Sequence, residues 1–291
     1  MKILSLILAS SLSLSAVSEL AVADENSQTP TARNAYYLAL GDSVTYGYQN
    51  SKAAAGLPPS GFNTGFVDDL SERLRQVMPS LVTVNYGCPG ESTDSFIATT
   101  AQCPWTLSGG QLHDSHVGSQ LDAAIQFLNA HKGEVKLISL TLWGIDVAKF
   151  VKSCAPGDFL CVQAGAPGLI GHIQVNLQTI LIKLRAAAPR AEIVVTGAWD
   201  SFIGAFAIGD PLFVALNGAM AETADSSHAK FADAFSVFNP TSDVNTETKA
   251  MCRLTLLCSV GDSHPSDTGY QALADVVFET SWLFSRDRWQ D

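Results

Sequence analysis

The sequence predicts one α/β domain of three layers, in which helices cover both faces of a five-stranded parallel sheet. Five short apolar runs, segments of helical periodicity between them, and long loops rich in glycine and proline lead to this prediction. Strands that alternate with helices favour right-handed crossovers and a parallel sheet buried on both faces. With 291 residues, the chain can bury one large core without needing a second domain.

The expected strands are short runs that lack the polar alternation of a half-exposed sheet. The first four runs are rich in β-branched or aromatic residues, which is typical of buried strands. The five runs occupy residues 35–40, 81–86, 136–142, 191–196 and 229–235. In such a sheet, ligands bind beyond the carboxyl ends of the strands.

Segments between the strands carry apolar residues three or four positions apart, which predicts amphipathic helices. One apolar stripe runs from Leu121 to Leu128, and a longer one runs from Ile170 to Leu184. Long loops are expected at residues 47–65, 87–118, 152–168 and 239–265. Loops of this length in a compact domain are commonly functional.

Residues 1–23 have the layout of a secretory signal peptide. Lys2 precedes an apolar stretch, and an Ala-Val-Ala sequence ends at Ala23. Serines interrupt this stretch, which is shorter than the roughly 20 residues of a membrane span, so cleavage is favoured over a membrane anchor. We therefore expect a secreted protein, extracellular or periplasmic, without an integral membrane segment in the mature chain. Residues 24–34 are expected to be a flexible lead-in to a domain that spans 35–291.

The net charge bears on nucleic-acid binding, and the cysteine content bears on disulfides and metal sites. The chain has 28 acidic and 17 basic residues, a net charge of −11, which disfavours nucleic-acid binding. Six cysteines in an exported protein predict disulfides, and pairing sequence neighbours closes the shortest loops. The pairs would be Cys88 with Cys103, Cys154 with Cys161, and Cys252 with Cys258, although other connectivities stay open. The cysteines lack zinc-knuckle spacing and a histidine cluster, so we expect no metal site.

A serine follows the first expected strand. The segment Gly41-Asp42-Ser43 places that serine at the carboxyl edge of the sheet, where the next turn offers N–H groups to an anion. Ser43 is therefore a candidate nucleophile. The alternative is that Asp42 or Ser43 only caps a short helix.

A histidine near the other end is the candidate base. It stands in Gly261-Asp262-Ser263-His264-Pro265, ahead of a helical run. A neutral histidine can take the proton of a serine hydroxyl, and a nearby carboxylate can fix its tautomer. Alone, His264 would also fit a surface histidine in a proline turn, but its pairing with Ser43 favours catalysis.

The two blocks together resemble the GDSL or SGNH hydrolases, which have a GDS block near the start and a DxxHP-like block near the end. Between them, the segment from Asn85 to Thr93 is similar to the second block of that family. The resemblance covers nearly the whole mature chain. Within the family, the chain is similar to the secreted, cysteine-containing bacterial esterases, lipases and phospholipases. It implies a flavodoxin-like parallel sheet and oxyanion donors at the N–H groups of Ser43 and Gly90. At Gly90, a plain glycine turn is the alternative.

Two positions depart from the family pattern. Ile145 stands where the third block has asparagine, and the loss of one oxyanion donor typically costs about 10²–10³ in turnover. The adjacent Asp146 does not replace it, because a carboxylate repels a developing oxyanion. Asp262 lies two residues before the histidine, whereas the family aspartate commonly lies three before, at the place of Gly261. We assign Asp262 as the orienting acid, with a backbone carbonyl as the alternative.

These assignments predict a serine esterase or lipase that cleaves carboxylic esters through an acyl-serine intermediate, without cofactor or metal, and we expect a monomer. Asp42, Trp143 and Gly144 are candidate substrate-binding residues. Aromatic side chains that could wall an apolar acyl pocket are Trp105, Trp143, Trp199, Phe202, Phe206 and Phe213. The alternatives are a polysaccharide deacetylase and a catalytically impaired lipid- or glycan-binding protein, which Ile145 would explain.

Overall fold

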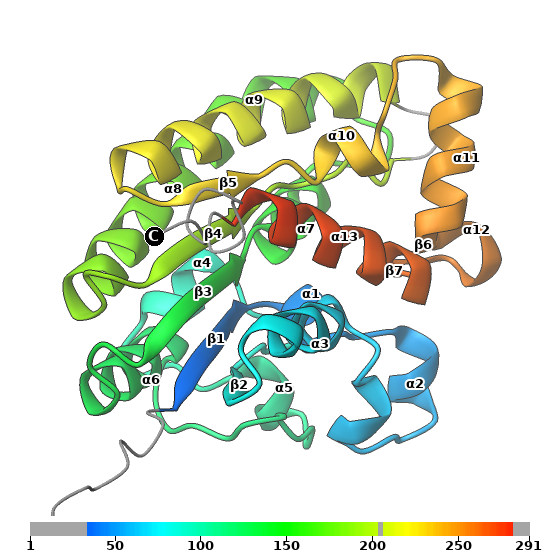
Figure 1. The fold of residues 1–291 in the computed structure, drawn as a ribbon. Helices are drawn as coiled ribbons and strands as arrows, with labels where there is room; N and C mark the ends of the chain where they lie inside the picture. The colour runs from blue at the N-terminus through cyan, green and yellow to red at the C-terminus, as the bar shows by residue number, and fades with distance from the viewer. Residues whose placement is uncertain (1–33, 203–205, 282–291) are drawn as a thin grey trace, which may run out of the picture. The chain divides into compact units, whose positions relative to one another are not determined.

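The computed structural model describes residues 34–202 and 206–281. Its sheet has five parallel strands in the order β2-β1-β3-β4-β5 (Figure 1), so the predicted sheet is confirmed. The strands are β1 (Ala35–Gly41), β2 (Leu81–Asn85), β3 (Val135–Thr141), β4 (Glu192–Thr196) and β5 (Lys230–Ala232). The expected signal peptide and nearly all of the lead-in lie outside the described residues.

Helices flank both faces of this sheet. They are α1 (Ser43–Tyr46), α2 (Asn50–Ala54), the 3₁₀ helix η1 (Pro59–Phe62), α3 (Phe66–Val77), α4 (Thr93–Ile97), α5 (Pro104–Leu107), α6 (Gln120–Ala130), α7 (Gly144–Ser153), α8 (Phe159–Ala187), α9 (Phe206–Ser226), α10 (Phe235–Phe238), α11 (Val244–Leu254), α12 (Leu257–Val260) and α13 (Asp267–Thr280). Helix α3 packs against α13, while α8 packs against both α6 and α9. A small antiparallel pair, β6 (Thr255–Leu256) and β7 (Asp262–Pro265), precedes α13.

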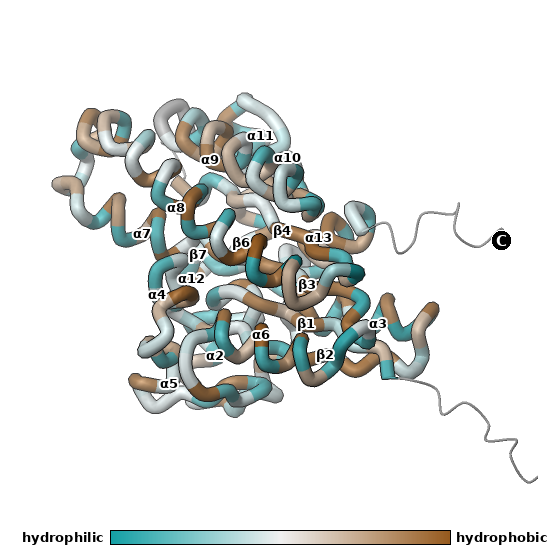
Figure 2. Tube along the Cα trace, turned by 90° about the vertical axis from the view of Figure 1, so that its left-hand side faces the viewer, coloured by the Kyte–Doolittle hydropathy of each residue, from teal (hydrophilic) through white to brown (hydrophobic). Residues whose placement is uncertain are grey.

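The core lies between the sheet and these helices. Tyr37, Leu38 and Leu40 of β1 are fully buried, as expected for the central strands of a sheet covered on both faces. Figure 2 shows hydrophobic residues along the inner strands, whereas the outer helices alternate between hydrophobic and hydrophilic positions. This pattern is the one that amphipathic helices on a buried sheet require.

All four segments expected as long loops contain helices, and α8 and α11 are the longest of these. Helix α8 begins at Phe159, where the Asp158 side chain accepts the N–H of Cys161, and it continues through Pro167. Helix α11 begins after Asp243, whose side chain accepts the N–H of Thr246. The loop predictions for 159–168 and 244–254 are wrong, because the capping aspartates start helices there despite the neighbouring glycine and proline residues.

The six cysteines form three disulfides, Cys88–Cys103, Cys154–Cys161 and Cys252–Cys258. This is the pairing that the short-loop argument favours. Within residues 34–202 and 206–281, no helix combines the length and apolar character needed to cross a membrane.

Candidate active site

Ser43 is placed by a tight junction between β1 and α1. Asp42 caps the helix, and its carboxylate accepts the N–H of Val44 at 2.9 Å, so the capping task falls to Asp42 and Ser43 becomes the first helical residue. Only glycine fits at position 41 of this junction, because its φ is +136° and a Cβ there would lie 2.0 Å from the carbonyl oxygen of Thr141. The Ser43 hydroxyl is thereby held at the carboxyl edge of the sheet.

His264 reaches Ser43 from the opposite end of the chain. The imidazole Nε2 lies 2.9 Å from the Ser43 Oγ, and Nδ1 lies 2.6 Å from Oδ1 of Asp262. The histidine belongs to β7, which starts directly after Gly261, whose φ of +71° makes the turn. The structure therefore joins these three predicted residues in one hydrogen-bonded line.

Asp262 is buried and has hydrogen-bond donors for both carboxylate oxygens. Its Oδ1 also accepts the backbone N–H of His264 at 3.1 Å, and its Oδ2 accepts that of Asn50 at 2.7 Å. Burial by itself would raise the pKa of Asp262, but the hydrogen bonds and charge of His264, with the Asn50 N–H, outweigh it and lower the pKa. An ionised Asp262 can only accept, so it fixes the proton of His264 on Nδ1 and leaves Nε2 facing the serine.

The second predicted block forms the loop after β2. Asn85 donates to the carbonyl of Thr45 at 3.0 Å, and the N–H of Cys88 donates to the carbonyl of Gly41 at 3.0 Å, so the loop is fastened beside α1. Gly90 has a φ of +90°, and a Cβ there would lie 3.1 Å from Pro104, the neighbour of Cys103. The positive φ explains why residue 90 is a glycine. The disulfide Cys88–Cys103 and the bonds of this loop hold it in place.

Glu91 belongs to this loop, and the sequence motif did not identify it as a site residue. It is 2% exposed, and Gln120 donates to its Oε2 at 3.3 Å while also bonding both backbone groups of Gly41. Burial raises the pKa of Glu91 to about 7, against the opposing effect of hydrogen bonds from Ser95 and Gln120. Through Gln120, this buried carboxyl is linked to Gly41 in the junction that precedes Ser43.

A mostly apolar cavity of about 330 Å³ opens beside Ser43 and His264. Of the predicted aromatic residues, those that line it are Trp143, Trp199, Phe202 and Phe213. Trp105 instead packs on Tyr48, with ring centroids 5.5 Å apart, and the side chain of Phe206 lies outside the described residues. Ile145 also lines the cavity, where it offers no hydrogen bond.

Helix α7 supplies cavity residues that the sequence analysis missed. They are Val147, Ala148, Val151 and Lys152, which join Gly144 at helical spacing. That spacing after the third strand was the signal that could have identified them.

The predicted substrate-binding residues Asp42, Trp143 and Gly144 all border the cavity. The carboxylate of Asp42 is nonetheless occupied by the protein itself, because the backbone N–H groups of residues 44, 143 and 144 donate to it. Burial raises its pKa to about 6 despite these bonds. Asp42 thus joins β1 to the start of α7. Of the three residues, Trp143 is the one that offers the cavity a large apolar side chain.

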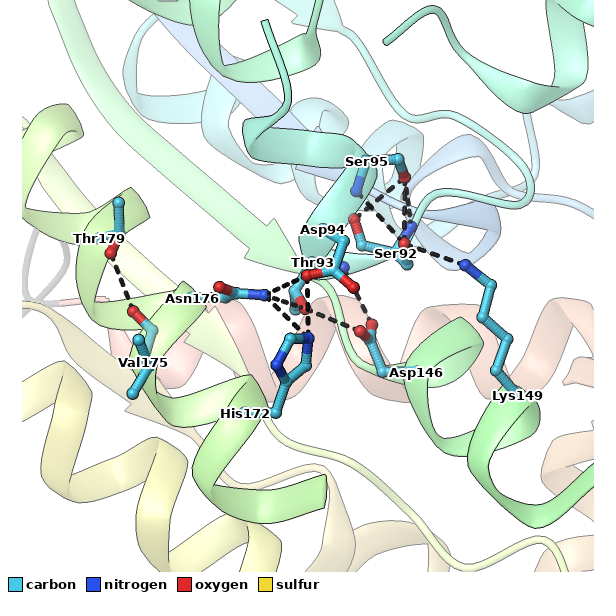
Figure 3. A network of polar contacts seen from close by, with 10 residues as sticks. All are labelled: Ser92, Thr93, Asp94, Ser95, Asp146, Lys149, His172, Val175, Asn176 and Thr179. Atoms are coloured by element: carbon cyan, nitrogen blue, oxygen red, sulfur yellow. Dashed lines mark hydrogen bonds and ion pairs between the residues drawn. The ribbon is translucent and has the colours of Figure 1, made fainter. Parts of the chain in front are cut away.

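Asp146 belongs to a polar network between α4, α7 and α8 (Figure 3). Its two oxygens accept the N–H and the hydroxyl of Thr93, at 3.0 and 2.7 Å. Asn176 then donates to the hydroxyl oxygen of Thr93 and to Asp94, which lies 2.9 Å from His172. Asp146 therefore anchors the helix that follows β3.

This network also contains one arrangement able to hold a metal. In the described part of the chain, ligand atoms of Asp94, Asp146 and His172 lie within 4.8 Å of one another. Both oxygens of Asp146 already have donors, and Asp94 accepts from Asn176. Hydrogen bonds within the protein thus account for the network.

The sequence matches the model of the GDSL-like lipase/acylhydrolase family over residues 39–272. A search of curated proteins finds no match. Solved structures with a similar fold include a lipase from a goat rumen metagenome, with 17% identity, a TM-score of 0.59, and coverage of 86% of this chain and 98% of that one.

Two further structures share this fold. The phospholipase A1 of Streptomyces albidoflavus NA297 has 17% identity and a TM-score of 0.58, with coverage of 85% of this chain and all of that one. An acetyl-xylooligosaccharide esterase of Geobacillus has 16% identity and a TM-score of 0.54, with coverage of 87% and 99%.

Proposed function

The chain belongs to the GDSL-like lipase/acylhydrolase family, and we propose that it hydrolyses carboxylic esters through an acyl-serine intermediate. The observation that carries this proposal is the line of Ser43, His264 and Asp262, with successive distances of 2.9 and 2.6 Å, at the edge of an apolar cavity. A nucleophile, a base and an orienting acid within hydrogen-bond reach are what acyl transfer requires.

The reaction begins when His264 Nε2 takes the hydroxyl proton of Ser43 while the Oγ attacks the ester carbonyl. Asp262 stabilises the imidazolium that forms. As the tetrahedral intermediate collapses, His264 gives the proton to the departing alkoxide, so an alcohol leaves and the acyl group stays on Ser43. Water, deprotonated by His264, then attacks the acyl-serine and releases the acid, which returns the serine to its starting form.

The negative charge on the carbonyl oxygen is stabilised by backbone N–H groups in this proposal. The first donor is the N–H of Ser43. Ser43 is the first residue of α1, and N–H groups in the first turn of a helix have no partner within the helix. The Gly90 N–H is the second donor. Ile145 supplies no third donor, so we expect turnover about 10²–10³ below that of an otherwise equal site with an asparagine there.

The substrate is proposed to be a lipid or another acyl ester, because aromatic and aliphatic side chains wall the cavity. We further propose that the protein acts outside the cytoplasm as a monomer and without a cofactor. Three disulfides support export, because such bonds persist in oxidising compartments.

A fluorophosphonate probe followed by peptide mass spectrometry tests this function. We expect one covalent adduct on Ser43, and we expect it to disappear in Ser43→Ala. The matched control is Ser263→Ala, since Ser263 is exposed and lines the same cavity. This variant should be labelled like the wild type.

Two results would contradict the proposal. Labelling that persists in Ser43→Ala would place the nucleophile elsewhere. No labelling of the folded protein, together with no hydrolysis of acetyl to decanoyl nitrophenyl esters, would favour a binding protein that lost its activity with the asparagine at 145.

A further inference from the structure

Gln120 bonds the end of β1 in the way that a neighbouring strand would. In the register of the sheet, the last residue of β2, Asn85, lies opposite Ala39, so β2 ends before it reaches Gly41. There the Gln120 Oε1 accepts the N–H of Gly41 at 2.6 Å, and Nε2 donates to the Gly41 carbonyl at 3.0 Å. The side-chain amide thus pairs both backbone groups of a buried residue, as a peptide group of β2 would.

The same amide reaches Glu91. Its Nε2 lies 3.3 Å from Oε2 of Glu91, and both residues are buried. Because Oε1 accepts the N–H of Gly41, the two hydrogens on Nε2 face the Gly41 carbonyl and the Glu91 carboxyl. The side chain of Ser95 also hydrogen-bonds this carboxyl. Gln120 therefore links Glu91 to the last residue of β1.

This link joins the two segments that carry the proposed oxyanion donors. Gly41 stands two residues before Ser43, and Glu91 directly follows Gly90. The backbone adds to the link, because the Cys88 N–H donates to the Gly41 carbonyl and the Glu91 N–H donates to the Cys88 carbonyl, at 3.0 and 3.1 Å. A shift of the loop against the end of β1 would therefore change the spacing between the two donors.

We propose that Gln120 and Glu91 are positioning residues, which set the spacing of the two backbone oxyanion donors. Neither residue lines the cavity, so both act through the backbone that they hold. An oxyanion donor is effective within about 2.7–3.1 Å of the charged oxygen, so small shifts of either donor matter. They matter more here because Ile145 supplies no third donor. The two roles rest on the proposed ester hydrolysis, whose oxyanion these donors stabilise.

The charge of Glu91 acts on the same donors. Burial raises its pKa to about 7 against the effect of its hydrogen bonds, while the charge of Asp42 raises it and that of Lys149 lowers it. Once the carboxyl has lost its proton, its negative charge stands on the residue after Gly90 and opposes the charge of the oxyanion. His264 must itself be neutral to take the serine proton. We therefore expect kcat to rise with pH as His264 becomes neutral, and to fall again above pH 7 as Glu91 ionises.

The first test removes the amide of Gln120. Gln120→Met keeps most of the side-chain volume but none of the hydrogen bonds, and kcat for nitrophenyl butyrate should fall at least about tenfold with KM nearly unchanged. The fluorophosphonate adduct on Ser43 should still form, but more slowly by a similar factor, because its phosphoryl oxygen uses the same donors. Gln126→Met, at an exposed position of α6, is the matched control and should stay close to the wild type.

The second test removes the charge of Glu91. Glu91→Gln keeps an oxygen that can accept the Nε2 hydrogen of Gln120, so kcat at pH 6 should stay within about threefold of the wild type. Above pH 7, its kcat should level off where that of the wild type declines. Glu91→Leu loses the bond and should lower kcat at every pH. Glu72→Gln, at an exposed glutamate, should keep the wild-type profile.

A merely structural role for either residue predicts a different result. Loss of packing lowers the Tm and the folded fraction, but it leaves the pH profile of the folded enzyme unchanged. Circular dichroism and titration of the reactive serine with the probe give the concentration of folded sites, so kcat is measured per site. If Gln120→Met does not fold, the pH profile of Glu91→Gln decides the question, because its side chain has nearly the shape of the original.

Three outcomes would overturn these roles while leaving the proposed function intact. The first is a kcat of Gln120→Met within about threefold of the wild type. The second is a Glu91→Gln profile that declines above pH 7 as the wild type does. The third is a wild type whose kcat does not decline there. A wild type that neither hydrolyses esters nor reacts with the probe would instead contradict the proposed function, and both roles with it.

Discussion

Asp262 bonds the same histidine twice: its Oδ1 lies 2.6 Å from the imidazole Nδ1 of His264 and 3.1 Å from the backbone nitrogen of that residue. A spacing of two residues allows this because β7 begins right after the left-handed turn at Gly261. The Asn50 N–H holds the other oxygen. The carboxylate is therefore oriented before substrate arrives, and its main effect should be on kcat.

Asp262→Asn should lower kcat by about 10³–10⁴ with little change in KM, because an amide no longer selects the productive tautomer of His264. Steady-state hydrolysis of nitrophenyl butyrate measures this effect, with circular dichroism as a check on folding. Asp267→Asn, at an exposed carboxylate, is the control and should stay close to wild type. A loss below tenfold would show that another group orients the histidine.

Ile145→Asn should raise turnover on short nitrophenyl esters, by up to about 10²-fold, because it restores a side-chain donor to the lining of the cavity. Ile145→Leu keeps the apolar character and should leave the rate within a few-fold. An unchanged or lower rate in the asparagine variant would mean that residue 145 does not face the oxyanion.

Ala148→Phe should narrow the cavity and discriminate against long acyl chains. Ala148 lines the cavity from α7, so a larger side chain occupies space proposed for the acyl group. We expect kcat/KM for octanoyl esters to fall at least tenfold relative to acetyl esters. The ratio across an ester series is the measurement, and a uniform loss at every length would place the acyl chain elsewhere.

Glu91→Gln should stabilise the fold at alkaline pH. Burial raises the Glu91 pKa to about 7 from its ordinary value of 4.5, so the folded chain binds more protons than the unfolded one. Stability is then highest below pH 4.5 and falls as the pH rises through 7. The glutamine amide stays neutral, so the free energy of unfolding of Glu91→Gln at pH 8 should exceed that of the wild type by about 1–3 kcal/mol.

Urea unfolding at pH 5 and pH 8 tests this prediction. The gain should be larger at pH 8, and Glu72→Gln, at an exposed position, should show no such difference. Equal stability of the Glu91→Gln variant and the wild type at pH 8 would show that Glu91 is well solvated when ionised.

The sequence alone determined the five strands, because buried parallel strands are continuous apolar runs whose signal is local. It also nominated Ser43 and His264, since their motifs stand at recognisable places in the chain, and the disulfide pairs, since each joins near neighbours. Local signals were weaker in the segments expected as long loops. Their glycine and proline residues predict loops, but capping aspartates at 158 and 243 start helices there.

Only the tertiary structure decided which polar groups meet. It directs the Asp42 carboxylate to backbone N–H groups at residues 143 and 144, and it turns Asp146 toward Thr93. It also brings Gln120 of α6 to Gly41 and Glu91. No local pattern encodes such contacts, because they depend on how strand order and helix packing bring distant side chains together, and on which of them lose their water.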